Sequence, residues 1–306
     1  MTGEKATAAW RADFALLGNT LIWGATFVLV KTALQDISSL LFIAIRFFIA
    51  AGALALAFRF RPAILFSQPG ALRGGIIVGA FLFAGYFFQT AGLRYTTASK
   101  SAFITGLSIP LVPILGAIVY RRWPRVRDVA GIVVATGGMA LLTLQDERIA
   151  FNRGDVLTMF CAAAFAGHIV SLGHFSKTLG FESLSVLQVA TAAILAGGSF
   201  WWVEDWFVEW RPAVVIALGV TGLLATAVAF TVQAWAQQHT TATRTALIFS
   251  MEPVFAALTA FAVLGEMLPQ QGIFGAILIL GGVLLVELKP AEHRAHQSVR
   301  DLLGKV

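Results

Sequence analysis

The chain has 306 residues, of which 58% are hydrophobic and only 12% are charged. A soluble domain carries about 25% charged residues, so this composition excludes a soluble globular protein. The net charge of +6 does not indicate nucleic acid, because the basic residues separate apolar runs and form no stripe. The single cysteine, Cys161, excludes an intrachain disulfide and a cysteine-ligated metal cluster. We therefore expect no cofactor, no metal and no nucleic-acid partner.

Long apolar runs follow one another along the whole chain. Each has about the length that an α-helix needs to cross ~30 Å of hydrocarbon. Helices are required because lipid offers no partner for unpaired backbone groups. The sequence therefore predicts an all-α integral membrane protein with ten transmembrane helices. The predicted spans are 14–31, 38–58, 74–93, 101–120, 129–145, 156–176, 183–203, 212–236, 245–265 and 270–287.

The lysines and arginines between the runs predict the orientation of the spans, because cytoplasmic loops carry an excess of them. With the N-terminus inside, far more basic residues fall on the inner side than on the outer side. The strongest cue is the segment 121–127 between the fourth and fifth spans, Arg-Arg-Trp-Pro-Arg-Val-Arg. We expect a multi-pass protein of the cell (inner) membrane with both termini in the cytoplasm.

The two halves of the chain are similar to each other. Residues 96–102, Thr-Thr-Ala-Ser-Lys-Ser-Ala, recur as 240–246, Thr-Thr-Ala-Thr-Arg-Thr-Ala, and Gln89 matches Gln233 at the same offset. At nearly the same offset, Trp23 falls on Phe165, Thr26 on His168 and Arg46 on Gln188.

Five spans per half is an odd number, so the second half begins on the opposite side of the membrane. The sequence therefore predicts two inverted five-helix repeats, an architecture of many secondary transporters. The predicted organisation is a cytoplasmic N-terminus at 1–13, a first repeat at 14–145, an outer linker at 146–155, a second repeat at 156–287 and a cytoplasmic tail at 288–306.

Glycines also recur between the halves, in the fifth and tenth spans. Small residues let helix backbones approach closely in membranes. We expect the adjacent pairs Gly137-Gly138 and Gly281-Gly282 to pack helices within or between the halves. The matching positions are Gly131, Gly137 and Gly138 in the first half and Gly275, Gly281 and Gly282 in the second.

Four short motifs accompany the repeat: Ile22–Phe27, Leu93–Ala98, Glu252–Leu258 followed by Leu264-Gly265-Glu266, and Gly275–Gly282. Together they resemble the EamA family of the drug/metabolite transporter superfamily, over roughly 14–287. The resemblance implies ten helices, no ATPase domain and, in many bacterial members, export of amino acids or related metabolites. It does not fix a substrate. His168 and His174 stand where many relatives are apolar.

Arg46 and Glu252 are the only formally charged residues between the ends of the predicted spans. A charge at the bilayer centre costs roughly 2.5–3.5 kcal/mol on insertion scales, and such residues usually mark substrate or proton pathways. Arg46 is a candidate for holding a substrate carboxylate, and Glu252 for taking up a proton or an ammonium group. The alternative is a structural pair, or side chains that snorkel to water.

Further polar and aromatic side chains are candidates for lining a translocation pathway. Tyr86 and Gln89 lie one helical turn apart, as do Trp23 and Thr26. His168 is either a second proton site or a neutral, hydrogen-bonded core histidine. No catalytic residue is predicted. The candidate binding and translocation residues are Trp23, Thr26, Arg46, Tyr86, Gln89, His168, Gln188, Gln233, Trp235 and Glu252, with Glu252 and His168 as candidates for proton coupling.

The sequence favours a secondary transporter that exports amino acids or related amphipathic metabolites by alternating access between two inverted repeats. An importer or exchanger of other metabolites is an alternative, because inverted halves are directionally neutral. A membrane enzyme acting on lipid-linked substrates would cluster catalytic residues at one interface, and a channel would favour a continuous polar pore. The expected partners are a small-molecule substrate and the lipid bilayer; the oligomeric state is open, and a monomer is compatible with it.

Overall fold

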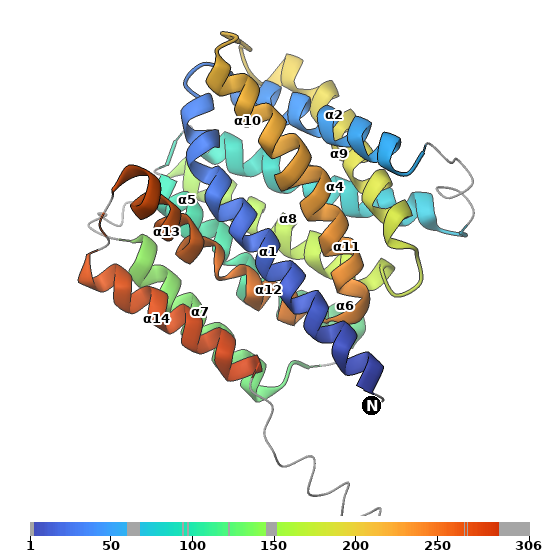
Figure 1. The fold of residues 1–306 in the computed structure, drawn as a ribbon, viewed down its shortest axis with the longest axis vertical. Coiled ribbons are helices and arrows are strands. Elements are labelled where there is room, and N and C mark those ends of the chain that lie inside the picture. Colours follow the sequence, from blue (N-terminus) through green and yellow to red (C-terminus); the bar gives the residue numbers. More distant parts are fainter. Residues whose placement is uncertain are drawn as a thin grey trace, which may run out of the picture.

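A computed structural model of the protein describes residues 3–59, 68–93, 95–96, 98–121, 123–144, 152–265, 267 and 269–287. Over these residues the fold is helical, and an isolated antiparallel bridge joins Ile37 to Val208. Figure 1 shows the arrangement. The helices are α1 (Gly3–Ala33), α2 (Ser39–Ala57), α4 (Ala71–Leu93), α5 (Ala98–Gly106), α6 (Ser108–Tyr120), α7 (Val126–Thr143), α8 (Arg153–Phe175), α9 (Phe181–Val203), α10 (Pro212–Gly222), η1 (Leu223–Val228), α11 (Ala229–His239), α12 (Ala242–Phe249), α13 (Glu252–Leu264) and α14 (Gln270–Glu287).

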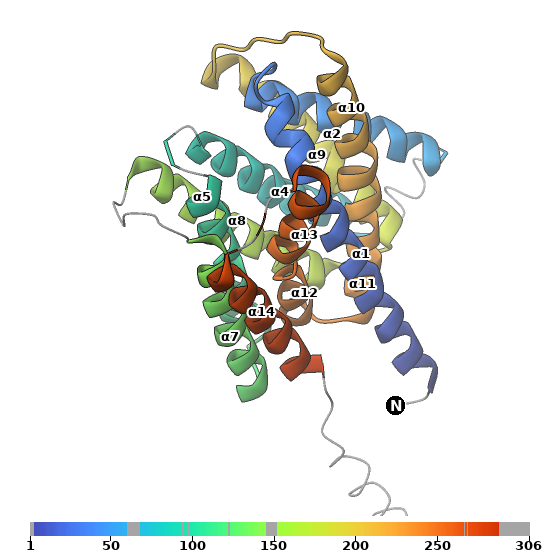
Figure 2. The same ribbon diagram turned by 60° about the vertical axis from the view of Figure 1, so that its left-hand side comes forward.

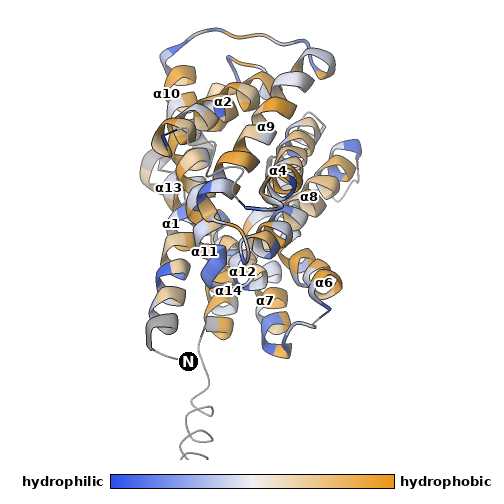
Figure 3. Cartoon of the chain, turned by 90° about the vertical axis from the view of Figure 1, so that its right-hand side faces the viewer, coloured by the Kyte–Doolittle hydropathy of each residue, from blue (hydrophilic) through white to orange (hydrophobic). Residues whose placement is uncertain are grey.

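Seven helical segments in the described part of the chain are long and apolar enough to cross a membrane. They confirm a multi-pass, all-α membrane protein, and Figure 3 shows hydrophobic residues along the lengths of the helices. The helices at the first, ninth and tenth predicted spans are not among the seven, so the count of ten stays a prediction. The seven segments are Ser39–Ala57, Ala71–Gly92, Ser101–Tyr120, Val126–Thr143, Arg153–Phe175, Phe181–Val203 and Pro212–His239.

The structure differs from the predicted spans in its helix boundaries. α1 begins at Gly3, well before the span predicted from residue 14. The fourth span is broken between α5 and α6, and the ninth between α12 and α13. Each break precedes one of two equivalent prolines, Pro110 and Pro253. Proline fits the first turn of a helix, where its missing N–H costs no hydrogen bond, and both prolines lie in the first turn of the helix that follows the break.

Glycines of α7 and α14 form a close contact between the two halves. A Cβ on Gly131 would lie 2.7 Å from the Gly282 carbonyl oxygen, and one on Gly138 would lie 2.6 Å from that of Gly275. Because Gly131 precedes Gly138 while Gly282 follows Gly275, the two helices run antiparallel. Equivalent glycines exchange places across this contact, as they do across a two-fold axis.

The expected packing role of the adjacent glycine pairs is correct for one member of each pair and wrong for the other. Gly138 and Gly282 lie in the contact between α7 and α14, whereas a Cβ on Gly137 or Gly281 would have no atom within 4 Å. The reason is helical geometry, since adjacent residues point about 100° apart on a helix of 3.6 residues per turn. The second contact on each helix is made seven residues away, about two turns, at Gly131 and at Gly275.

The other helices form two equivalent bundles, seen from two directions in Figures 1 and 2. In the first bundle, α8 packs against α4, α5 and α6; in the second bundle, α1 packs against α10, α11, α12 and α13. The first helix of each half therefore belongs to the bundle of the other half. Between the bundles, α2 packs against α9. The N-terminal end of α1 and the C-terminal end of α14 lie at the same lower end of the molecule in both views.

Candidate functional site

The candidate site is built around a π-helical turn, η1, that lies between α10 and α11. Such turns are rare and frequently occur at functional sites. Thr226 Oγ1 donates to the carbonyl of Thr221, five residues earlier, at 2.8 Å. The carbonyl oxygen of Ala225 accepts from Trp23 Nε1 at 2.9 Å and from Arg46 Nη2 at 3.1 Å. The wide turn thus binds side chains from both α1 and α2.

Arg46 is 6% exposed, and the groups that it contacts are neutral. Its Nε donates to Thr226 Oγ1 at 2.6 Å, and its Nη2 donates to Tyr86 Oη at 3.1 Å as well as to Ala225. The guanidinium carbon lies 5.0 Å from the centre of the Tyr86 ring, within the range of a cation–π contact. Among the described residues, Nη1 has no hydrogen-bond partner, so its two N–H groups remain for a ligand.

Glu252 begins α13 and is partly buried. The described residues show no ion pair between Glu252 and Arg46. The roles of the two residues, as substrate or proton sites or as a structural pair, therefore stay hypotheses. Gly24 brings α1 close to this end of α13, since a Cβ there would lie 2.8 Å from the Ala256 nitrogen and 3.0 Å from the Glu252 carbonyl.

Aromatic rings surround these polar groups in two equivalent sets. The Trp23 ring lies 5.6 Å from Phe230, and the Tyr86 ring lies 5.5 Å from Phe165. In the repeat, Trp23 corresponds to Phe165 and Tyr86 to Phe230, so the two contacts are equivalent. Trp23 also contacts Phe249 at 4.9 Å. A guanidinium and a carboxylate set among aromatic rings suit a ligand that is both charged and apolar.

A second polar group lies across Phe230 from Trp23. His168 Nε2 and Gln188 Oε1 are 2.9 Å apart, and both side chains are buried. The His168 ring lies 5.6 Å from Phe230. Gln188 Nε2 has no partner in the described part of the chain, and neither has the Oε1 of Gln233, whose Nε2 donates to Gln237 at 3.3 Å. Buried amide groups without partners are uncommon in native proteins, so these two atoms are candidates for water or substrate contacts.

Three candidate residues lie apart from this cluster. Thr26 donates to the carbonyls of Ile22 and Trp23 in its own helix. Gln89 Nε2 donates to Thr105 Oγ1 at 3.3 Å, between α4 and α5. Trp235 contacts His239 and packs against the start of α1 near Ala12 and Leu16.

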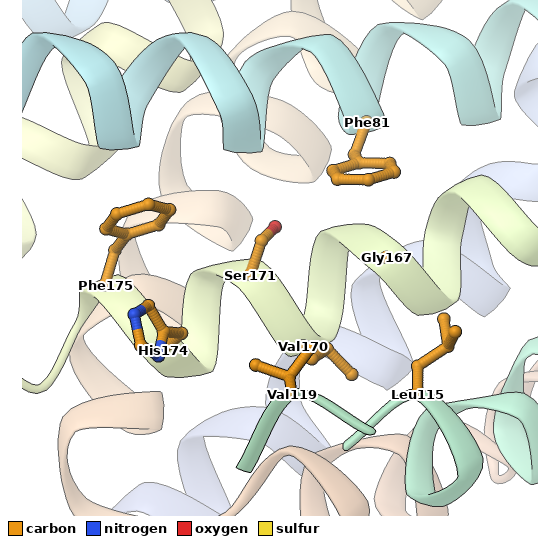
Figure 4. Close-up of a pocket in the computed structure, with 8 residues that line it drawn as sticks. All are labelled: Phe81, Leu115, Val119, Gly167, Val170, Ser171, His174 and Phe175. Atoms are coloured by element: carbon orange, nitrogen blue, oxygen red, sulfur yellow. The ribbon is translucent and has the colours of Figure 1, made fainter. Parts of the chain in front are cut away.

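The structure also contains an apolar crevice between α4, α6 and α8, drawn in Figure 4. Phe81 from α4, Leu115 and Val119 from α6, and Ser171 and His174 from α8 contribute to its walls. None of the candidate binding residues lines it. No group of three or more metal-binding side chains occurs in the described ranges.

Comparison with known protein families assigns the chain to one of them. The sequence matches the EamA-like transporter family twice, over residues 10–144 and 152–288. This chain belongs to the EamA family. The two successive matches are the two repeats, and the EamA member described here is a multi-pass membrane transporter.

Relatives support the same assignment. An uncharacterized transporter of Archaeoglobus fulgidus is 37% identical over 94% of this chain and 89% of its own length. A protein of Salmonella typhimurium named as a probable amino-acid metabolite efflux pump is 25% identical over 89% of this chain and 93% of its own. A solved crystal structure shares the fold with a TM-score of 0.77 at 19% identity, covering 90% of this chain and 96% of that one.

Residues missing from the sequence-based set are Thr226, the Ala225 carbonyl and the rings of Phe165, Phe230 and Phe249. The repeat carried a signal for Phe165 and Phe230, since they are the equivalents of Trp23 and Tyr86. No comparable signal marks Thr226, which is one of several threonines in apolar surroundings.

Proposed function

We propose that this EamA transporter is a secondary transporter that exports amino acids or related amphipathic metabolites by alternating access. The observation that carries the proposal is the buried Arg46 guanidinium, which has neutral partners and, among the described residues, two N–H groups without a partner. A substrate carboxylate would complete it, because guanidinium groups bind carboxylates through charge-assisted hydrogen bonds. The relative named as a probable amino-acid metabolite efflux pump supports the same substrate class.

In the proposed site, both ends of a zwitterion would have a partner. Arg46 would bind the carboxylate, and Glu252, whose carbonyl lies beside Gly24 in the helix that carries Trp23, would bind the ammonium group or a proton. The rings of Trp23, Phe230 and Phe249 would contact the apolar part of the substrate.

The mechanism in this proposal uses two inverted repeats of five helices each. The antiparallel contact of α7 with α14 supports inversion, because a two-fold axis parallel to the helices would make equivalent helices parallel. We place the protein in the inner membrane with both termini in the cytoplasm. In Figure 1 the N-terminal end of α1 and the C-terminal end of α14 lie at the same end of the molecule, which supports this topology.

Flux through purified protein tests the proposed function. We expect proteoliposomes without ATP to exchange at least one radiolabelled zwitterionic amino acid in a counterflow assay, and protein-free liposomes to show none. Strict dependence on ATP would contradict secondary transport. Chemical conversion of a lipid-linked substrate, without flux, would favour the membrane-enzyme alternative.

Glu252→Gln is expected to remove the pH dependence of transport while leaving the protein folded. The amide keeps the size of the side chain and cannot bind a proton. If Glu252 carries the coupled proton, the wild-type rate changes up to about tenfold per pH unit, as a single titrating group allows, and the variant rate stays flat. Initial rates from pH 5 to pH 9 give the comparison. An unchanged pH profile in Glu252→Gln would move the assignment to His168, whose variant is measured in parallel.

A further inference from the structure

The two bundles contact each other at the end of the molecule that holds the N-terminal end of α1 and the C-terminal end of α14. There α8 contacts α11 and α12, and α6 contacts α12. By the repeat, these three contacts are equivalent to three other pairs of helices: α1 with α4, α1 with α5, and α13 with α5. Among the described residues, none of these equivalent pairs is in comparable contact. Over the described residues, one end of the structure is therefore closed between the bundles, and the other end lacks the three equivalent contacts.

Lys177, in the turn between α8 and α9, binds the end of α11. Its Nζ donates to the carbonyl oxygens of Gln237, Gln238 and Thr240 at 2.7, 3.1 and 3.0 Å. An ammonium group has three N–H donors, and all three are used. The last carbonyls of a helix lack intrahelical partners, and the end of the helix dipole favours a cation there.

Gln237 makes a second connection, deeper in the membrane. Its Nε2 donates to the backbone carbonyl of Ile169 at 2.9 Å, and both groups are buried. Gly173 makes the approach of α8 and α11 possible, because a Cβ there would lie 3.2 Å from Gln237 Nε2 and 3.4 Å from Ala242 Cβ. Gln238 adds a third bond, from its Nε2 to the carbonyl of Leu179 at 3.2 Å.

The sequence does not repeat these residues at the other end. At the offsets of the repeat, Lys177 corresponds to Gln35, Gly173 to Lys31 and Gln237 to Leu93. Leucine has no hydrogen-bonding group to replace the glutamine, and lysine is far larger than glycine. The closed end therefore has connections that the other end cannot form in the same way.

We propose that Lys177 and Gln237 are positioning residues of a cytoplasmic gate, which holds the two bundles together while the opposite end is open. The proposal rests on the proposed alternating-access function. Release of the gate would let α8 and α11 separate and expose the site to the cytoplasm. A role limited to capping α11 would affect stability without changing which end is accessible.

Thiol labelling tests the gate without knowledge of the substrate. The background carries Cys161→Ala, and Ala242→Cys places a reporter at the contact between α12 and Gly173. A maleimide is added from each side of the membrane in turn. We expect Lys177→Met and Gln237→Leu to raise labelling from the Lys177 side about tenfold, Lys177→Arg to restore low labelling, and Gln35→Met to have no effect on it.

Thermal unfolding of each variant separates gate opening from loss of structure. Unchanged labelling in folded Lys177→Met and Gln237→Leu would overturn the gate, whatever the substrate. If either variant does not fold, labelling of the other variant and of Lys177→Arg decides whether the gate exists. Increased labelling together with failed counterflow in wild type would keep the gate and reject the proposed function. In transport assays, opening the gate should change KM and kcat by different factors.

Discussion

Arg46→Ala is expected to reduce the transport rate at subsaturating substrate about 30-fold or more. Removing one partner of a buried, charged hydrogen-bonded pair costs roughly 2–5 kcal/mol, and 1.4 kcal/mol is a factor of ten in binding. The fold should survive, because Thr226 keeps its bond to Thr221 and Ala225 keeps its bond to Trp23. Counterflow in proteoliposomes measures the loss, and a thermal melt measures stability.

Two matched variants separate charge from geometry at this position. Arg46→Lys keeps the charge, but its single nitrogen cannot reproduce the planar set of bonds to Thr226, Tyr86 and Ala225, so we expect partial activity. Arg211→Ala removes a guanidinium that is 62% exposed, and it should transport normally. Wild-type KM and rate in Arg46→Ala would show that the guanidinium does not touch the substrate.

Gly138→Val is expected to destabilise the protein by about 3 kcal/mol or to prevent assembly of the halves. The added side chain would start 2.6 Å from the Gly275 carbonyl and 2.8 Å from the Ile279 nitrogen. Both are backbone atoms of α14, so the helices must move apart. Overpacking of this kind typically costs 1–3 kcal/mol and occasionally more.

The neighbouring glycine provides the control. Gly137→Val meets no atom within 4 Å, so its effect should be limited to the small preference of valine against helix. By the repeat, Gly282→Val should behave like Gly138→Val, and Gly281→Val like Gly137→Val. Unfolding in mixed detergent micelles gives the four values. Equal losses at Gly137 and Gly138 would contradict the contact between α7 and α14.

The sequence indicated the centre of the candidate site because charged residues are scarce within the predicted spans. A membrane interior tolerates few charges, so Arg46 and Glu252 stood out, and helical spacing added Trp23 and Tyr86. The structure brings Arg46, Trp23 and Tyr86 together around η1. The π-turn itself was not predictable, because Leu223–Val228 contains neither proline nor glycine, and its geometry depends on side chains from α1 and α2.

Other features that the sequence did not predict also depend on packing between distant helices. His168 and Gln188 were each candidates, but their hydrogen bond depends on the relative rotation of α8 and α9. Hydropathy located the fourth and ninth spans, yet it does not report where a helix breaks within an apolar run. The equivalent prolines Pro110 and Pro253 were the available signal for those breaks. Part of the resemblance motif, Glu266, and the predicted tail at 288–306 lie outside the described residues.

The π-turn also has a consequence for the register of the eighth span. A π-turn bonds each N–H one residue further back than an α-turn does, so η1 takes up an extra residue locally. The side chains of α10 and α11 can therefore keep the same relative orientation about the helix axis, although the segment between them contains one extra residue. Phe230, Gln233 and Gln237 follow that turn at helical spacing, and Phe230 contacts His168 and Gln237 donates to Ile169, both in α8. Shortening that turn by one residue would alter the wall of the site without rotating the segment that carries the gate.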